Sequence, residues 1–280
     1  MQTLEVVVIL EMNKDFYRGG MVYQDEDPYM NYEPYKLTKT LTLRGPRPDF
    51  NNPYLCFVGA AQTFGRYCER PFPQIVCDHL KKGCLNMGFG GADPSYFLKD
   101  EILEYVNGSE IVFVQVFSSR SCSNSVFKNC GGTRHGSANG KYILADDFWQ
   151  NCLKNYDFKR TFSLIQETRN QYVESMINLA KSINKKKYLL WFSYRNPEYS
   201  INFSSYFGMT NYFPHFVNLD MVNCIKPYFD GYIECVGMEG IPQKVNKSVI
   251  NTYYPSPENH TKMSVKLIES LKKDIVKLYA

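Results

Sequence analysis

The 280-residue chain has no apolar run of the roughly 18 residues that a transmembrane helix needs. The run Val6–Leu10 is too short, and its flanks too acidic, for a signal peptide. The chain also lacks a strong excess of positive charge. Its formal net charge is only +4, and its Lys and Arg residues are scattered instead of clustered. We therefore expect a cytoplasmic protein with no membrane insertion and no nucleic-acid partner.

Closely spaced cysteine pairs are missing too. The nine cysteines are an odd number, which does not indicate a closed disulfide framework, and they include no Cys-x-x-Cys pair, which a zinc ribbon would need. His79, His135 and His215 share no metal-ligand spacing, so we predict no metal site. With 44% hydrophobic and 21% charged residues, the composition is that of a folded globular protein.

Five short apolar runs set the predicted fold. Such runs are typical of strands that are buried on both faces of a parallel sheet, and helical patterns lie between them, the clearest over Thr161–Ile183 and another over Phe97–Val106. The pattern predicts an α/β fold, a three-layer α/β/α sandwich around a five-stranded, mainly parallel, flavodoxin-like sheet. The runs are Tyr54–Val58, Cys84–Met87, Ile111–Phe117, Tyr188–Phe192 and Tyr232–Val236.

Residues 1–50 predict an N-terminal, β-rich extension packed on this core. Its expected strands are Leu4–Leu10 and Thr38–Leu43, and the Tyr-, Asp- and Pro-rich stretch Phe16–Tyr35 between them predicts a surface loop. Residues 51–280 then form a single α/β domain.

Two connections are longer than usual, at residues 118–156 and 193–214. Long connections within a compact domain are usually functional lids or disordered segments. Both follow a predicted strand, and ligands of such sheets bind at the carboxyl ends of the strands. We therefore expect the functional site at that edge of the sheet.

Three turns carry a resemblance to a known superfamily. They read Gly-Ala-Ala-Gln-Thr-Phe-Gly over 59–65, Leu-Asn-Met-Gly-Phe-Gly-Gly over 85–91 and Pro-Ser-Pro-Glu-Asn-His over 255–260. In order and spacing they resemble the SGNH hydrolases, in which the first turn holds a serine nucleophile, the second an oxyanion donor and the third the Asp and His of a triad. The resemblance implies an SGNH-like domain with His260 as the base and with Asn86 and Gly91 at the oxyanion site.

The chemistry departs from that pattern at three positions. Ala61 stands in place of the serine, Ala60 in place of the neighbouring Asp, and Pro257 in place of the triad Asp. An attacking hydroxyl and an orienting carboxylate are therefore both missing from their usual places. Glu258 or Ser256 can orient His260 instead, and replacement nucleophiles follow the third predicted strand: Ser118, Ser119, Ser121 and Cys122.

A more specific resemblance covers about residues 43–193 and the C-terminal histidine. Leu-Arg-Gly-Pro-Arg-Pro over 43–48, Pro-Phe-Pro over 71–73 and Leu-Leu-Trp-Phe over 189–192, with the turns above, resemble a bacterial family of unknown function with SGNH-like architecture. That resemblance implies an association with surface glycans. A similar branch comprises capsular polysaccharide acyltransferases that use coenzyme A. Taken together, these resemblances imply a glycan or small hydroxylated substrate, and an acyl donor such as acetyl-CoA that is not tightly bound.

Further side chains near the strand ends are candidate ligand contacts. Each also has a structural interpretation: turn chemistry, loop stapling by Arg120, or helix capping by Asp93. Arg120 is suited to grip a phosphate, sulfate or carboxylate. Arg44, Arg47, Arg66 and Arg70 would widen a basic rim or lie solvated on the surface. The candidate ligand-binding residues are Ala61, Gln62, Thr63, Asn86, Gly91, Asp93, Arg120 and Asn124.

The sequence thus favours a group-transfer enzyme, for O-acyl transfer or ester hydrolysis, with a triad that lacks the usual serine. In this scheme His260 activates a bound acceptor hydroxyl directly. A catalytically silent module that binds a glycan or a protein is an alternative, and a sulfotransferase is a further one. The sequence leaves the oligomeric state open.

Overall fold

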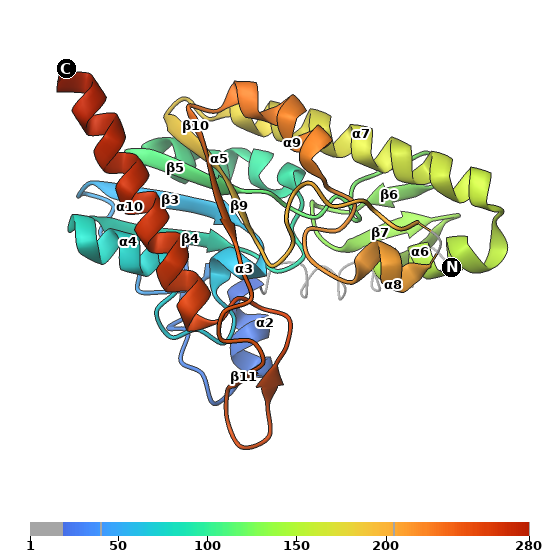
Figure 1. Cartoon of the computed structure of the whole chain (residues 1–280), viewed down its shortest axis with the longest axis horizontal. Helices are drawn as coiled ribbons and strands as arrows, with labels where there is room; N and C mark the ends of the chain where they lie inside the picture. The colour runs from blue at the N-terminus through green and yellow to red at the C-terminus, as the bar shows by residue number, and fades with distance from the viewer. Residues whose placement is uncertain (1–18, 40, 204, 280) are drawn as a thin grey trace.

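The computed structural model describes residues 19–39, 41–203 and 205–279. Within them, five parallel strands form one sheet in the order β10-β9-β5-β3-β4 (Figure 1). Taken along the chain, this is the 2-1-3-4-5 order of flavodoxin-like folds, so the predicted sheet is confirmed. The strands are β3 (Tyr54–Gly59), β4 (Gly83–Gly88), β5 (Ile111–Gln115), β9 (Lys186–Ser193) and β10 (Gly231–Val236).

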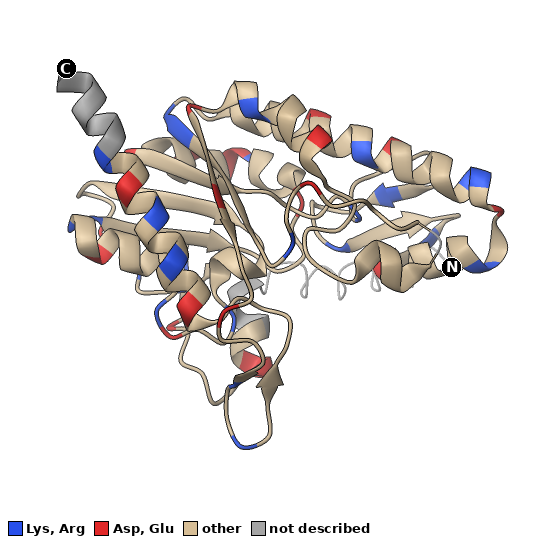
Figure 2. Ribbon diagram, viewed as in Figure 1, with Lys and Arg blue, Asp and Glu red and all other residues tan. Residues whose placement is uncertain are grey.

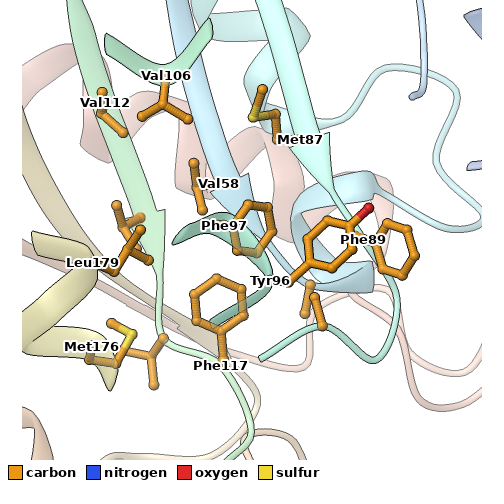
Figure 3. Packing of buried hydrophobic residues seen from close by; sticks show 14 of the residues in the cluster. Val58, Met87, Phe89, Tyr96, Phe97, Val106, Val112, Phe117, Met176 and Leu179 are labelled. Carbon is orange, nitrogen blue, oxygen red and sulfur yellow. The ribbon is translucent and has the colours of Figure 1, made fainter. Parts of the chain in front are cut away.

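Helices cover both faces of the sheet, as predicted (Figure 1). One face packs against α4 (Phe72–Leu80) and α10 (Pro257–Tyr279), where Leu55, Phe57 and Met263 share one apolar cluster. The other face packs against α5 (Asp100–Gly108), α7 (Phe158–Ser182) and α9 (Leu219–Ile225). Figure 3 shows that second layer, in which the strand residues Val58, Met87 and Val112 lie among Phe97, Met176 and Leu179. Burial of apolar residues on both faces explains why the strands are continuous apolar runs.

The helix expected over Phe97–Val106 is two elements. A 3-10 helix η1 (Pro94–Leu98) comes first, and Lys99, in an extended conformation, separates it from α5. Asp93 caps η1 by accepting from the Ser95 backbone N–H at 2.8 Å, and α5 begins anew with two acidic residues in its first turn. Capping is therefore confirmed as a role of Asp93.

The N-terminal extension differs from its prediction. Leu4–Leu10 lies outside the described residues, and helix α2 (Gly19–Glu26) occupies part of the expected loop Phe16–Tyr35. Two glycines open this helix and make its intrinsic propensity poor. Arg66 holds its end, through an ion pair of 2.8 Å to Glu26 and another of 2.8 Å to the following Asp27.

A short antiparallel hairpin completes the extension. Strand β1 (Tyr35–Lys36) pairs with β2 (Thr42–Leu43), so the expected strand over Thr38–Leu43 is shorter than predicted. Leu37, Leu41 and Leu43 are buried in the same cluster as the second face of the sheet. Their burial joins the extension to the main core.

Arg44 is buried rather than part of a basic rim. Its Nη1 donates to the carbonyls of Phe64 at 3.1 Å and Gly65 at 2.8 Å, and its Nη2 donates to those of Cys68 and Glu69 at 2.7 Å each. Four carbonyls of the segment after β3 therefore converge on one guanidinium. Arg44 organises the backbone that follows the first strand of the sheet.

The connection at 118–156 is a folded subdomain. It contains an antiparallel sheet of β6 (Phe127–Asn129), β7 (His135–Ala138) and β8 (Lys141–Leu144), followed by α6 (Ala145–Asn155). Phe127 and Trp149 are buried with Leu164 of α7 and Phe216 in a separate apolar cluster.

The remaining elements are short. They are α3 (Ala61–Phe64), α8 (Tyr206–Thr210) within the 193–214 connection, η2 (Lys226–Tyr228), and a hairpin of β11 (Gln243–Lys244) and β12 (Ile250–Asn251). No helix in the described part of the chain is long and apolar enough to cross a membrane. Figure 2 shows charged residues of both signs along α7 and along the part of α10 that is not drawn in grey.

Candidate functional site

A cavity of about 510 Å³ lies at the carboxyl edge of the central sheet. The turns that follow β3, β4 and β5 contribute Ala61, Gly91 and Ser118 to its lining. The chain leaves β3 toward α4 on one face of the sheet and leaves β5 toward α7 on the other. Such a topological switch point opens a crevice between the two connections, and this is where doubly wound folds bind ligands. The cavity is therefore the candidate functional site.

Ser118 and His215 meet in this cavity. The Ser118 Oγ lies 2.7 Å from the His215 Nδ1 and accepts the backbone N–H of His215 at 3.1 Å. Because Oγ already accepts that N–H, its own proton is free to point at Nδ1. The other ring nitrogen, Nε2, lies 3.2 Å from the hydroxyl of Tyr253. Ser118 comes just after β5, and the 193–214 connection delivers His215.

The surroundings of His215 keep its imidazole neutral. The ring is buried, and this burial lowers its pKa well below the usual value, with further contributions from the positive charges of Arg120 and Arg195. The Arg120 Nη1 lies 3.0 Å from Nδ1 and 3.1 Å from Nε2. No carboxylate oxygen contacts the ring among the hydrogen bonds of the described residues. A neutral imidazole can accept the proton of Ser118, but an imidazolium here would face a guanidinium.

Five of the predicted site residues line the cavity. Gln62 is buried at its wall, and its buried Oε1 has no hydrogen-bond partner in the described structure. The five residues are Ala61, Gln62, Gly91, Ser118 and Arg120, and the lining also includes the candidate nucleophile Ser121, which is buried, and Arg66 of the predicted basic rim.

His260 does not lie at the cavity. Its ring is fully buried, stacks on Phe72 with centroids 5.8 Å apart and contacts Phe192. Its Nδ1 accepts the backbone N–H of Phe72 at 3.1 Å, and burial lowers its pKa to about 3. The prediction that His260 activates a substrate hydroxyl needs access to a ligand, and this placement denies that access.

Glu258 and Ser119 also lie away from the lining. Glu258 is exposed near Gly240 and does not contact His260 through any hydrogen bond of the described residues. Ser119 is buried, and its Oγ lies 3.5 Å from the carbonyl of His215. Neither residue is positioned to reach a ligand in the cavity.

Four other predicted ligand contacts hold the surrounding backbone. Asn86 donates to the carbonyl of Thr63 at 3.0 Å and accepts the N–H of Gly88 at 2.9 Å. Thr63 donates its hydroxyl to Gln115 at 2.6 Å. Asn124 accepts two N–H groups of its own turn, and Asp93 caps η1. All four are buried, and each stabilises a turn beside the cavity instead of lining it.

The structure adds residues that the sequence did not single out for this site. His215 was set aside because it has no metal-ligand spacing, and Tyr253, Tyr254 and Arg134 formed no motif. The sequence held one usable signal for His215, which is that it directly follows the long 193–214 connection leaving the end of a strand. The candidate nucleophile Cys122, by contrast, is buried, and this burial raises the pKa of its thiol. The raised pKa disfavours the thiolate, which is the reactive form.

The two buried histidines predict an acid-labile fold. Both have lowered pKa values in the folded state, so below about pH 6.5 the unfolded chain binds more protons and stability falls with pH, by up to about 1.4 kcal/mol per unit for each histidine. Asp93 opposes this, because burial raises its pKa to about 6. We measure the free energy of unfolding in urea at pH 6.5 and at pH 4.5. Between these pH values, His260→Asn should lose less stability than the wild type, and the variant of an exposed histidine, His79→Asn, should lose as much as the wild type. Equal slopes in all three proteins would contradict this account.

A family model described as "Domain of unknown function (DUF6473)" matches residues 21–160 and 149–276. The chain belongs to the DUF6473 family. No curated protein matches the chain.

Solved structures are similar at low identity. One is a Lactobacillus plantarum protein solved by structural genomics, with 12% identity and a TM-score of 0.42, covering 79% of this chain and 97% of its own. Another is the lipase Lip_vut3 from a goat rumen metagenome, with 13% identity and a TM-score of 0.41, covering 78% and 96%. Neither the DUF6473 description nor these distant neighbours assigns a reaction to this chain.

Proposed function

We propose that this DUF6473 protein moves an acyl group to or from a hydroxyl, by O-acyl transfer or ester hydrolysis. Ser118 is the nucleophile and His215 the base. One observation carries the proposal: the Ser118 Oγ lies 2.7 Å from a neutral imidazole nitrogen inside a cavity at the switch point of the sheet. A hydroxyl within hydrogen-bond reach of a neutral imidazole is the arrangement that activates a serine.

The reaction divides into two balanced steps. The Ser118 Oγ forms a bond to the carbonyl carbon while its proton passes to the His215 Nδ1. The bond to the leaving oxygen or sulfur then breaks, and that atom takes the proton from His215. In the second step, water or an acceptor hydroxyl gives its proton to His215 and attacks the acyl carbon, the bond from that carbon to the Ser118 Oγ breaks, and the Oγ takes the proton back from His215.

Other groups in the cavity fit the supporting roles. Tyr253 contacts the second ring nitrogen and so helps to orient the imidazole. The turns at Ala61 and Gly91 bring backbone N–H groups to the same lining, where we assign them to the oxyanion that develops on the carbonyl oxygen.

The substrate class follows from the lining and from the resemblance. Five aromatic side chains border the cavity and offer ring faces and hydroxyls to a sugar: Tyr23, Phe89, Phe213, Tyr253 and Tyr254. We propose a glycan or small hydroxylated molecule as the acceptor and, from the resemblance to capsular polysaccharide acyltransferases, acetyl-CoA as a donor that binds only during turnover. Such a donor fits a cytoplasmic site of action.

Turnover by the purified full chain tests the proposal. We expect release of free coenzyme A from acetyl-CoA when hydroxylated sugars are present, or of 4-nitrophenol from 4-nitrophenyl acetate, and a much lower rate with His215→Asn. Release is followed by chromatography, because the nine cysteines interfere with thiol reagents. No release from any ester or thioester, or equal release by His215→Asn, would contradict the proposal.

A silent binding module is the second candidate, and one observation favours it. The partner of His215 is the Arg120 guanidinium where a triad has a carboxylate, which disfavours the imidazolium that base catalysis requires. Sugars that stabilise the protein against heat without any turnover would favour this alternative.

A further inference from the structure

The position of Arg120 is the unusual feature of the site. Its Nη1 lies within 3.1 Å of both ring nitrogens of His215. Its Nε lies 3.4 Å from Asp146, whose carboxylate also accepts the hydroxyl of Tyr206 at 2.7 Å. The Arg120 backbone is fixed as well, because its carbonyl accepts the indole N–H of Trp149 at 2.8 Å. The subdomain at 118–156 thus holds this guanidinium against the catalytic imidazole.

This position conflicts with base catalysis in the unliganded site. When His215 takes the proton of Ser118, two positive charges lie about 3 Å apart, and Asp146 offsets them only through a long contact to the far nitrogen of Arg120. Arg195 adds a third positive charge nearby. The negative charge that would make the imidazolium stable must therefore arrive with a ligand.

A second guanidinium borders the same cavity. Arg134 is exposed, and its side-chain carbons lie 3.2 to 3.5 Å from the point where a Cβ on Gly91 would stand. It has no ion pair in the described structure. Arg134 and Arg120 both belong to the 118–156 subdomain, so this side of the cavity presents two guanidinium groups.

The acidic residues of the lining come from a different segment of the chain. Glu26 and Asp25 come from α2, and Glu26 is ion-paired with Arg66 at 2.8 Å. Arg66 also binds Asp27. Because Arg66 is engaged by α2, it is not a third anion-binding group, and an anion is drawn toward Arg120 and Arg134.

We infer that the substrate carries an anionic group, a carboxylate, phosphate or sulfate, next to its ester, and that Arg120 and Arg134 hold this group beside Ser118 and His215. The inference rests on the proposed function and adds a substrate class to it. The anion offsets the charge of Arg120 as the proton moves to His215. Its contribution is therefore largest in the transition state, which raises kcat more than it lowers KM.

Matched esters test this inference. We expect kcat/KM, corrected for the uncatalysed rate, to be at least 10-fold higher for one anionic ester, mono-4-nitrophenyl succinate or 4-acetoxybenzenesulfonate, than for neutral 4-nitrophenyl acetate. Arg120→Gln and Arg134→Gln should lose this preference. The exposed Arg160→Gln, on α7 beside Tyr156, should keep it. The two anionic esters carry their charge on the acyl and the alcohol side, so they also show on which side the group lies.

The outcomes separate the inference from the proposed function. Equal kcat/KM for neutral and anionic esters, or a preference that survives in both arginine variants, overturns the inference and leaves the Ser118–His215 reaction standing. If no ester is cleaved, thermal shifts with succinate, sulfate and phosphate decide. Stabilisation of the wild type but not of Arg134→Gln supports an anion site and overturns the proposed reaction, whereas no stabilisation by any anion overturns both.

Discussion

Replacement of Ser118 by alanine is expected to lower acyl turnover by about 10³-fold or more, with the folded structure retained. The variant removes the Oγ that lies 2.7 Å from the His215 Nδ1, and without it no acyl-enzyme can form. Ser118 is half-buried at the cavity wall, and its loss leaves the backbone N–H of His215 without its Oγ acceptor, so we expect a stability loss of about 1–3 kcal/mol with the fold retained. The measurement is kcat/KM for the best ester, together with the melting temperature.

Ser119→Ala is the matched control. It removes the same group from the next residue, which is buried and outside the cavity lining. We expect its turnover to stay within a few-fold of the wild type. Similar losses in both variants would mean that the loop is perturbed and that Ser118 has no chemical role.

Arg44→Met is expected to destabilise the fold by about 3 kcal/mol or more. The variant keeps an apolar stem but removes one donor from each of four carbonyls. Those of Phe64 and Gly65 keep a second donor, whereas those of Cys68 and Glu69 lose the one that the structure gives them, and an unpaired buried polar group costs about 1–3 kcal/mol before relaxation. It also removes the cation from the rings of Tyr32 and Phe64, whose centroids lie 5.0 and 5.5 Å away. Urea unfolding followed by circular dichroism measures the loss.

Arg47→Met controls for the loss of a positive charge in the same segment. Arg47 is exposed and lies 5.7 Å from the ring of Phe50, so we expect a change of less than about 0.5 kcal/mol. A loss for Arg44→Met no larger than that for Arg47→Met would refute the role given to Arg44.

Most of the central fold was predictable because its signals are local. A strand buried on both faces must be apolar throughout, and β3 is buried along its whole length, so its run Tyr54–Val58 is visible without tertiary information. Helix α2 was not visible. Its sequence opens with two glycines, and long-range ion pairs from Arg66 hold its end.

The motif positions were recognisable, but their roles were not. Asn86 and Gly88 match an oxyanion turn in spacing, yet Asn86 holds the backbone after β3. A Cβ on Gly88 would lie 2.0 Å from the backbone nitrogen of Phe64, so this glycine permits α3 to pack on β4. His260 occupies the expected place at the start of α10, but the N–H of Phe72 takes its Nδ1. Spacing specifies where a turn lies, while packing decides whether its side chains reach the ligand.

The Ser118–His215 pair could not be predicted from the sequence as a pair. Ser118 was a candidate because it follows a buried strand, whereas its partner is 97 residues further along the chain. Two connections with no shared motif deliver the two side chains, and only the three-dimensional fold brings them together. Arg134 reaches the cavity in the same way, across Gly91 from the loop between β6 and β7.

The central claim is that Ser118 carries the acyl group, and the most direct measurement is the mass of the protein during turnover. The chain is mixed with 4-nitrophenyl acetate and with mono-4-nitrophenyl succinate, quenched in acid and digested, and the acylated peptide is sequenced by mass spectrometry. We predict one acyl group, on Ser118, which is absent from Ser118→Ala and disappears when the ester is exhausted. Turnover without an adduct on Ser118, or an adduct that persists in Ser118→Ala, would contradict the account.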